Sequence, residues 1–203
     1  MLTYKNIIVT DKEKIKIIAT KTKLFAPKTE EEMFYEICFC LCSPQTTLSK
    51  NSELNRELKE RHFYRKDIPF FELQELTTKV RFYQRKASFL IEAKREWKTI
   101  YAIMADPYVT DYIKREWLVK NVRGLGFKTA SHFLRNALGY EYFAIIDTHI
   151  CKFLGIILPK SPTMYKTQEL RFMEISKKFG MTPMELDLFI FSHYSGQNLE
   201  DVR

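Results

Sequence analysis

The sequence predicts an all-α fold, and three observations support this prediction. Glycine and proline are scarce, with 6 and 7 among the 203 residues. Stretches of alternating polar and apolar residues are few, whereas apolar residues recur at helical spacing along most of the chain. Two segments also carry the Thr-x-x-Glu pattern of a capping box, which marks the start of a helix.

The expected helices follow one another with short connections. The first begins after Thr29, whose capping partner is Glu32, and the last begins after Thr182, where a proline takes the first helical position. Glycines stand where two helices should end, at Gly139 and Gly180. Further helical stretches are expected near residues 48–60, 80–98, 110–120, 127–138, 147–155 and 164–179.

We expect residues 1–203 to form one functional unit of two helical subdomains. Subdomain A spans about residues 30–145, and subdomain B combines about residues 1–29 with 146–203. A cleft between two such lobes is a common place for a ligand, and we expect the active site there.

Charge and hydropathy narrow the class of protein. The formal net charge is +8, from 33 Lys and Arg against 25 Asp and Glu. This excess suits a polyanionic partner such as DNA, although a lysine-rich protein without such a partner remains an alternative. No stretch approaches the roughly 20 apolar residues that cross a bilayer, and no signal peptide is evident. We therefore expect a cytoplasmic protein with no membrane partner.

Three of the four cysteines, Cys38, Cys40 and Cys42, occupy alternate positions of the first expected helix. Residues at i, i+2 and i+4 do not share one helix face, and the paired C-x-x-C spacing of zinc or iron–sulfur sites is missing. We therefore expect buried free thiols that pack as small apolar residues, and no metal site.

Residues 118–134 carry the pattern that points most directly to a function. Apolar residues end one helix, Gly124 and Gly126 make a tight turn around one apolar residue, and a second amphipathic helix follows. Two glycines permit positive φ and expose backbone N–H groups at a helix N-terminus, which suits a phosphate. This helix-hairpin-helix pattern predicts contacts to the DNA backbone, with Arg123 beside it; a purely structural turn is the alternative.

A lysine and an aspartate complete the pattern. Lys128 lies two residues after the second glycine, and Asp147 follows the apolar run Ala144–Ile146, 19 residues beyond Lys128. Alone, Asp147 would be interpreted as a helix N-cap and Lys128 as one more solvated or phosphate-contacting lysine. Together with the hairpin they are typical of a Schiff-base-forming lysine and its carboxylate partner.

These residues resemble the helix-hairpin-helix DNA glycosylase superfamily, and within it the archaeal-type, second family of 8-oxoguanine DNA glycosylase/AP lyase. The resemblance covers most of the chain. It includes residues 39–46, 81–87, 130–136, 144–147 and 185–188. The resemblance implies a base-excision-repair enzyme that excises 8-oxoguanine and cleaves the strand at the abasic site by β-elimination.

The resemblance also implies roles for individual residues. Lys128 would be the nucleophile and Asp147 would stabilise charge developing on the sugar. His149 would contact a phosphate, and Gln45 would enter the base stack as a wedge, although a capping His and a helix-start Gln are alternatives.

A base pocket is implied as well. It would include Phe82, Phe191, Asp187 and the C-terminal Arg203, which stands where the family usually has a lysine. Core packing competes for both phenylalanines, and a helix end competes for Asp187.

The expected partner is double-stranded DNA containing 8-oxoguanine, bound by a monomer that needs no cofactor and acts at the nucleoid of a prokaryotic cell. Two alternatives remain: a glycosylase/lyase of the same fold for another lesion, such as an oxidised pyrimidine, or a non-enzymatic helix-hairpin-helix DNA-binding module. Asp147 argues against the second, since a binding module needs no such carboxylate.

Overall fold

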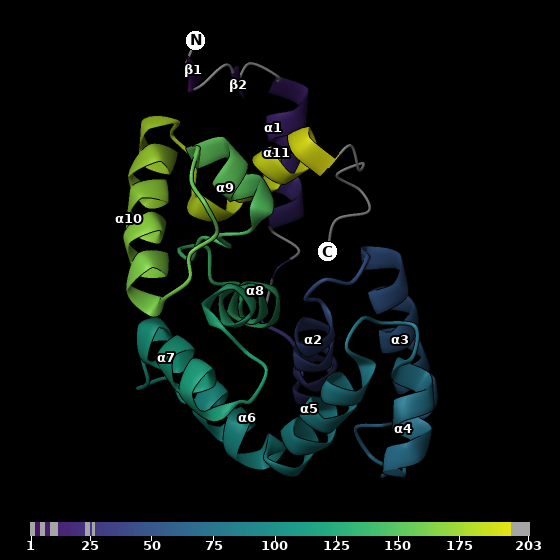
Figure 1. Cartoon of the computed structure of the whole chain (residues 1–203). Helices are drawn as coiled ribbons and strands as arrows, with labels where there is room; N and C mark the ends of the chain where they lie inside the picture. The colour runs from purple at the N-terminus through teal and green to yellow at the C-terminus, as the bar shows by residue number, and fades with distance from the viewer. Residues whose placement is uncertain (1–2, 5–6, 9–11, 23–24, 26, 196–203) are drawn as a thin grey trace. The chain divides into compact units, whose positions relative to one another are not determined.

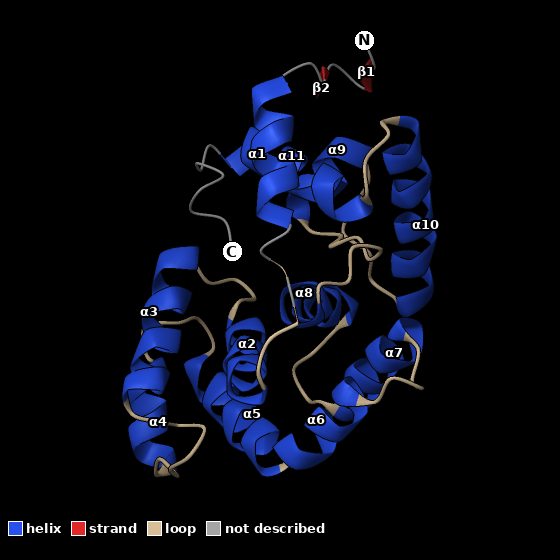
Figure 2. Cartoon of the chain, turned by 180° about the vertical axis from the view of Figure 1, so that it is seen from behind, coloured by secondary structure: helices blue, strands red, loops and turns tan. Residues whose placement is uncertain are grey.

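The structure, a computed structural model, describes residues 3–4, 7–8, 12–22, 25 and 27–195. Its described part consists of eleven helices and one small antiparallel ribbon, so the predicted all-α class is confirmed with a minor addition (Figure 1 and Figure 2). The ribbon joins β1 (Thr3–Tyr4) to β2 (Ile7–Ile8). None of the described helices is both long and apolar enough to cross a membrane.

The chain forms two compact units. Unit 1 comprises Met1–Ala26 and Leu138–Arg203, and unit 2 comprises Pro27–Ala137. The helices of unit 2 are α2 (Glu30–Cys42), α3 (Leu48–Glu60), α4 (Phe70–Thr77), α5 (Tyr83–Arg95), α6 (Trp97–Ala105), α7 (Asp111–Asn121) and α8 (Phe127–Leu138), whose last residue belongs to unit 1. The helices of unit 1 are α1 (Lys12–Thr22), α9 (Thr148–Leu154), α10 (Pro162–Lys178) and α11 (Pro183–Ser195).

Helix α2 is the centre of unit 2. Its predicted capping box is present, because Glu32 N–H donates to Thr29 Oγ1 (3.4 Å) while Thr29 N–H donates to Glu32 Oε2 (2.9 Å). The helix packs against α3 and α5. Phe34 is fully buried and contacts the rings of Phe63 and Trp97 at centroid distances of 5.6 and 5.2 Å. These aromatic contacts connect α2 to two distant parts of unit 2.

The central position of α2 explains its cysteines. Cys38 and Cys42 lie four residues apart on one side of the helix and Cys40 lies on another, yet all three are buried and free, as is Cys151 in α9. Burial raises the pKa of each of these thiols, that of Cys42 to about 12 and that of Cys151 to about 11. The prediction of buried thiols that pack as apolar residues is confirmed.

In unit 1, helix α11 packs against α1, α9 and α10 (Figure 1). Its predicted capping box is also present: Thr182 N–H donates to Glu185 Oε2 (2.8 Å) and Glu185 N–H donates to Thr182 Oγ1 (3.2 Å). The expected helix ends at Gly139 and Gly180 are confirmed, since both residues have positive φ, 73° and 66°.

The expected single helix over residues 80–98 is wrong. Helix α5 starts only at Tyr83 and ends at Arg95, and α6 follows after Glu96, whose φ of −88° and ψ of 2° break the helical path. Helix α4, which begins after Pro69, was not expected either. Apolar residues keep a helical spacing through the break at Glu96 and around α4, so spacing alone reveals neither the break nor the extra helix.

Candidate active site

The hairpin connects α7 to α8, and Gly124 is the residue that its geometry requires. Gly124 has φ of +97°, in a region that side-chain-bearing residues rarely adopt. A Cβ built on it would lie 2.5 Å from Cδ2 of Phe89, in α5. The neighbouring Leu125 is buried, so the turn inserts one apolar side chain between the two glycines.

Gly126 differs from this expectation. It does not have positive φ, and a Cβ on it would meet nothing within 4 Å. Its N–H is also engaged, because it donates to Thr129 Oγ1 (2.9 Å). The first helical bond of α8 runs from Ala130 N–H to Gly126 O (2.9 Å), so the amides of Lys128 and Thr129 have no acceptor within the helix. Those amides, rather than that of Gly126, are the open backbone donors at the start of α8.

Arg123, expected to contact the DNA backbone, lies exposed beside the turn. Its guanidinium donates to Glu92 Oε1 (2.6 Å) and lies 5.4 Å from the centre of the Phe89 ring. Both partners come from α5, so α5 fixes the direction in which Arg123 leaves the hairpin.

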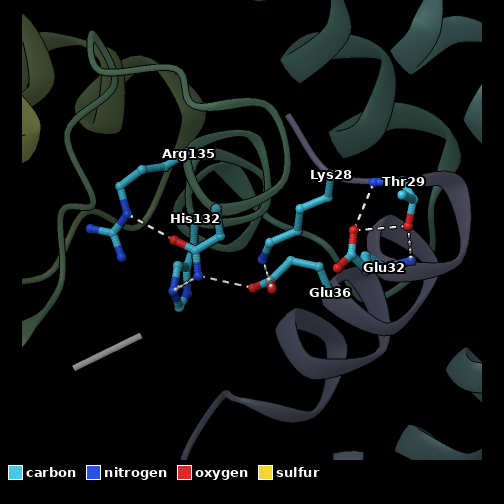
Figure 3. Close-up of polar contacts among 7 residues, drawn as sticks. Lys28, Thr29, Glu32, Glu36, His132 and Arg135 are labelled. Carbon is cyan, nitrogen blue, oxygen red and sulfur yellow. Dashed lines mark hydrogen bonds and ion pairs between the residues drawn. The ribbon is translucent and has the colours of Figure 1, made fainter. Parts of the chain in front are cut away.

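Lys128 lies half-buried in the first turn of α8. One helical turn and two turns further on, His132 and Asn136 continue the same face. Asn136 Nδ2 donates to Glu36 Oε1 (2.9 Å), and Glu36 also pairs with Lys28 (2.5 Å), so this face is fastened to α2 (Figure 3).

A buried arginine joins α8 to α7. Arg115, in α7, donates to Ser131 Oγ (3.0 Å) and lies 5.3 Å from the Phe127 ring centre. It is 2% exposed, and its position inside the hairpin was not foreseen, because a lone arginine in a basic chain gives no signal of burial.

Asp147, in unit 1, is fixed by the buried extended segment that precedes it. The hydroxyl of Tyr165, in α10, donates to Ala144 O (2.7 Å) and accepts from Ile146 N–H (3.1 Å). Asp147 Oδ1 then accepts the N–H groups of His149 (2.8 Å) and Ile150 (2.9 Å), so the N-cap role is real. Oδ2 forms no hydrogen bond or ion pair with any described residue.

The other expected residues of unit 1 cluster around α11. The ring of His149 meets Phe191 edge-to-face at 5.2 Å and stacks against Tyr194 at 6.4 Å, so His149 and Phe191 are brought together. Asp187 is buried within α11, not at a helix end. Arg203 lies outside the described residues.

Gln45 and Phe82 share an unusual backbone. They are two of the three non-glycine residues with positive φ in the described part of the chain, at 54° and 59°. Gln45 lies exposed in the turn between α2 and α3, and Phe82 lies just before α5 with 49% of its surface exposed. Phe82 therefore precedes the helix that was expected to include it, and the alternative of core packing for its side chain is wrong. Such backbone outliers cluster at functional sites.

No group of three His, Cys, Asp or Glu side chains suited to a metal occurs in the described ranges. A helical fold with a glycine hairpin, a lysine at the start of its second helix and a capping aspartate defines a helix-hairpin-helix protein of the DNA glycosylase type. Residues 16–181 match the sequence model of the 8-oxoguanine DNA glycosylase family, and the chain belongs to that family.

Two relatives are similar in sequence to this chain over most of their own length. The chain is 33% identical over 187 residues to the 8-oxoguanine DNA glycosylase/AP lyase of Methanocaldococcus jannaschii, covering 88% of this chain and 87% of the relative. It is 34% identical over 173 residues to the enzyme of that name from Thermoplasma acidophilum, covering 83% and 82%.

Two solved structures have the same fold as this chain. The crystal structure of the Methanocaldococcus jannaschii 8-oxoguanine DNA glycosylase superposes with a TM-score of 0.81 at 31% identity, covering 93% of this chain and 91% of the other. The glycosylase/lyase of the same organism in complex with a 15-mer DNA containing 8-oxoguanine gives 0.79 at 30% identity, covering 90% and 91%.

Proposed function

We propose that this protein excises 8-oxoguanine from double-stranded DNA and then cleaves the strand at the abasic site. The observation that carries the proposal is a shared fold. It covers 90% of this chain and is shared with a relative whose structure was solved in complex with DNA containing that lesion. Acting on such DNA, the protein would work at the nucleoid, in the cytoplasm of a prokaryotic cell like those of its relatives.

In this proposal the hairpin binds the backbone and the target nucleotide leaves the stack, since its glycosidic carbon is inaccessible inside a duplex. The N–H groups at the start of α8 would donate to a phosphate, supported by the helix dipole. Gln45 would fill the vacated space, Phe82 and Phe191 would stack on the flipped base, and His149 would add a phosphate contact. Asp187 and the C-terminal Arg203 would complete the base pocket.

Lys128 and Asp147 would perform the chemistry. The Lys128 amine forms a bond to C1′ as the bond from C1′ to the base breaks, and the base leaves with the electron pair and takes up a proton. Ring opening gives an iminium between Lys128 and the sugar; removal of a C2′ proton then expels the 3′ phosphate. The free Oδ2 of Asp147 would stabilise positive charge on the sugar while Oδ1 continues to cap α9.

Borohydride trapping tests this function, because borohydride reduces the iminium to a stable protein–DNA adduct. We expect an adduct with a duplex containing one 8-oxoguanine, and none with unmodified guanine. Lys128→Gln should abolish the adduct, whereas Lys120→Gln, at an exposed position near the end of α7, should retain it. An adduct only with an oxidised pyrimidine would overturn the substrate, and adduct formation by Lys128→Gln would overturn the nucleophile.

A further inference from the structure

Lys86 is a buried lysine that donates all its side-chain hydrogen bonds to one turn of the chain. It lies in the first turn of α5 and is 3% exposed. Its Nζ donates to Cys42 O (2.8 Å), Pro44 O (2.8 Å) and Thr46 Oγ1 (2.7 Å). An ammonium has three donors, so the turn between α2 and α3 saturates it.

The charge of Lys86 is not balanced by an ion pair. No acidic side chain lies within ion-pair distance of its Nζ in the described part of unit 2, and burial lowers the pKa of the amine. Burying an ammonium is unfavourable, and an apolar side chain of similar length would fill the same space without that cost. Packing alone therefore does not explain a lysine here, whereas the need to bind three oxygens does.

The turn that Lys86 binds is the turn that carries Gln45. Two of the three acceptors, Pro44 O and Thr46 Oγ1, directly flank Gln45, and Thr46 N–H closes the turn by donating to Ser43 O (3.1 Å). The positive φ of Gln45 is rare for a residue with a side chain, and such a conformation persists only where surrounding contacts impose it. Lys86 supplies those contacts.

The same residue also connects to Phe82. The backbone N–H of Lys86 donates to Phe82 O (3.1 Å), which is the first helical bond of α5. The next carbonyl, Tyr83 O, accepts from Thr77 Oγ1 (3.2 Å). Two consecutive hydrogen bonds thus hold the backbone at and just after Phe82, which has the left-handed conformation and a ring partly in solvent.

We infer that Lys86 is a positioning residue that couples Gln45 to Phe82, keeping both side chains oriented to open the base stack and receive the extruded base. This inference rests on the proposed function. It assigns to Lys86 the flipping step, which precedes bond breaking, and no direct contact with the reacting atoms.

The variant Lys86→Met retains the length of the side chain and removes its donors. We expect single-turnover excision of 8-oxoguanine from a duplex to fall by about tenfold to a hundredfold, because small displacements of positioning groups have effects of that size. An 8-oxoguanine in an unpaired bubble is already unstacked, so its excision should stay within about threefold of the wild-type rate, because a lesion that is already unpaired costs least to flip. The Gln45→Ala and Lys86→Met effects should overlap rather than add in the double variant.

Lys94→Met is a matched control. Lys94 lies on the same helix and binds a different turn, through Phe63 O (2.7 Å), Lys66 O and Asp67 (2.9 Å). Both rates should stay near wild type in this variant. Thr46→Val, which removes only one acceptor, provides a milder test if Lys86→Met does not fold.

Hydrogen exchange tests the role of Lys86 in fixing the turn separately from the proposed function of the protein. Lys86→Met should raise exchange at residues 43–47, and Lys94→Met should not. Unchanged exchange there, or equal losses on duplex and bubble, would overturn the role of Lys86. A wild-type protein that excises 8-oxoguanine from neither substrate would overturn the proposed function instead, and the exchange data would still show whether Lys86 fixes the turn.

Discussion

At the scale of single residues, Asp147 divides two tasks between its two oxygens. Oδ1 accepts two backbone N–H groups at the start of α9, and Oδ2 has no partner among the described residues. The two hydrogen bonds to Oδ1 hold the carboxylate against the start of the helix, and they thereby fix the direction in which Oδ2 points. A group that must face a developing charge benefits from such preorganisation.

Asparagine at position 147 would separate the two tasks. Asp147→Asn retains an oxygen acceptor and should change the free energy of unfolding by less than about 1 kcal/mol. Excision should nevertheless fall by about 100- to 1000-fold, because the negative charge is lost. Chemical denaturation and single-turnover kinetics measure the two effects; a fully active Asn variant would remove Asp147 from the chemistry.

The residue scale also shows what a sequence does not contain. The N-cap position of Asp147 follows from local chemistry and was predicted. The left-handed backbone of Phe82 was not, because the hydrogen bonds that hold this stretch, from Lys86 N–H to Phe82 O and from Thr77 Oγ1 to Tyr83 O, have no signature in the sequence. Likewise, nothing marks Lys86 as buried among the 33 Lys and Arg residues of the chain.

At the scale of elements, the hairpin is asymmetric. Its first glycine has positive φ and packs against Phe89, and its second has neither property. The G-x-G pattern predicted the element, since a tight turn between helices requires at least one glycine. It did not reveal which glycine is essential, because the Phe89 ring comes from α5, more than 30 residues earlier in the chain.

Alanine substitutions should expose this asymmetry. Gly124→Ala should destabilise the protein by about 1–3 kcal/mol, since the new methyl group meets the Phe89 ring and φ is unfavourable. Gly126→Ala should cost less than about 1 kcal/mol, mainly through the weaker start of α8. Thermal unfolding of both variants checks this, and equal losses would mean that the hairpin geometry differs from the one described.

The same scale explains which helices were predicted. Capping boxes at Thr29 and Thr182 are complete within four residues, so their hydrogen bonds could be inferred from the sequence. The break at Glu96 has no such signature, because neither proline nor glycine marks it. The short helix α4 likewise lies in a stretch whose apolar residues fit several interpretations.

At the scale of the whole molecule, the net charge of +8 governs how the protein meets its substrate. Composition predicted a polyanionic partner without saying which residues bind it. The structure adds that several basic side chains already form ion pairs with glutamates of the same chain: Arg123 with Glu92, Lys79 with Glu57, and Lys28 with Glu36. The count of 33 Lys and Arg residues therefore overstates the number of basic side chains that are free to neutralise phosphates.

Salt dependence measures that number. The affinity for duplex DNA should fall linearly on a log–log plot against salt concentration, with a slope of about −0.9 for each phosphate neutralised. Damaged and undamaged duplexes should share this slope and differ only in intercept, because the contacts to the flipped base are mostly uncharged. Affinity that does not change with salt would exclude backbone binding as the main source of affinity.

The two units also differ in how the chain builds them. Unit 2 is one uninterrupted stretch, whereas unit 1 needs α1 from the beginning of the chain and α11 from near its other end. During synthesis the ribosome releases everything required for unit 2, Lys128 included, before it releases residue 183. During that time helix α1 is already synthesised but has no α11 to pack against. A chain halted before α11 would therefore contain a complete hairpin in unit 2, while unit 1, which carries Asp147, would still lack the helix against which α1, α9 and α10 pack.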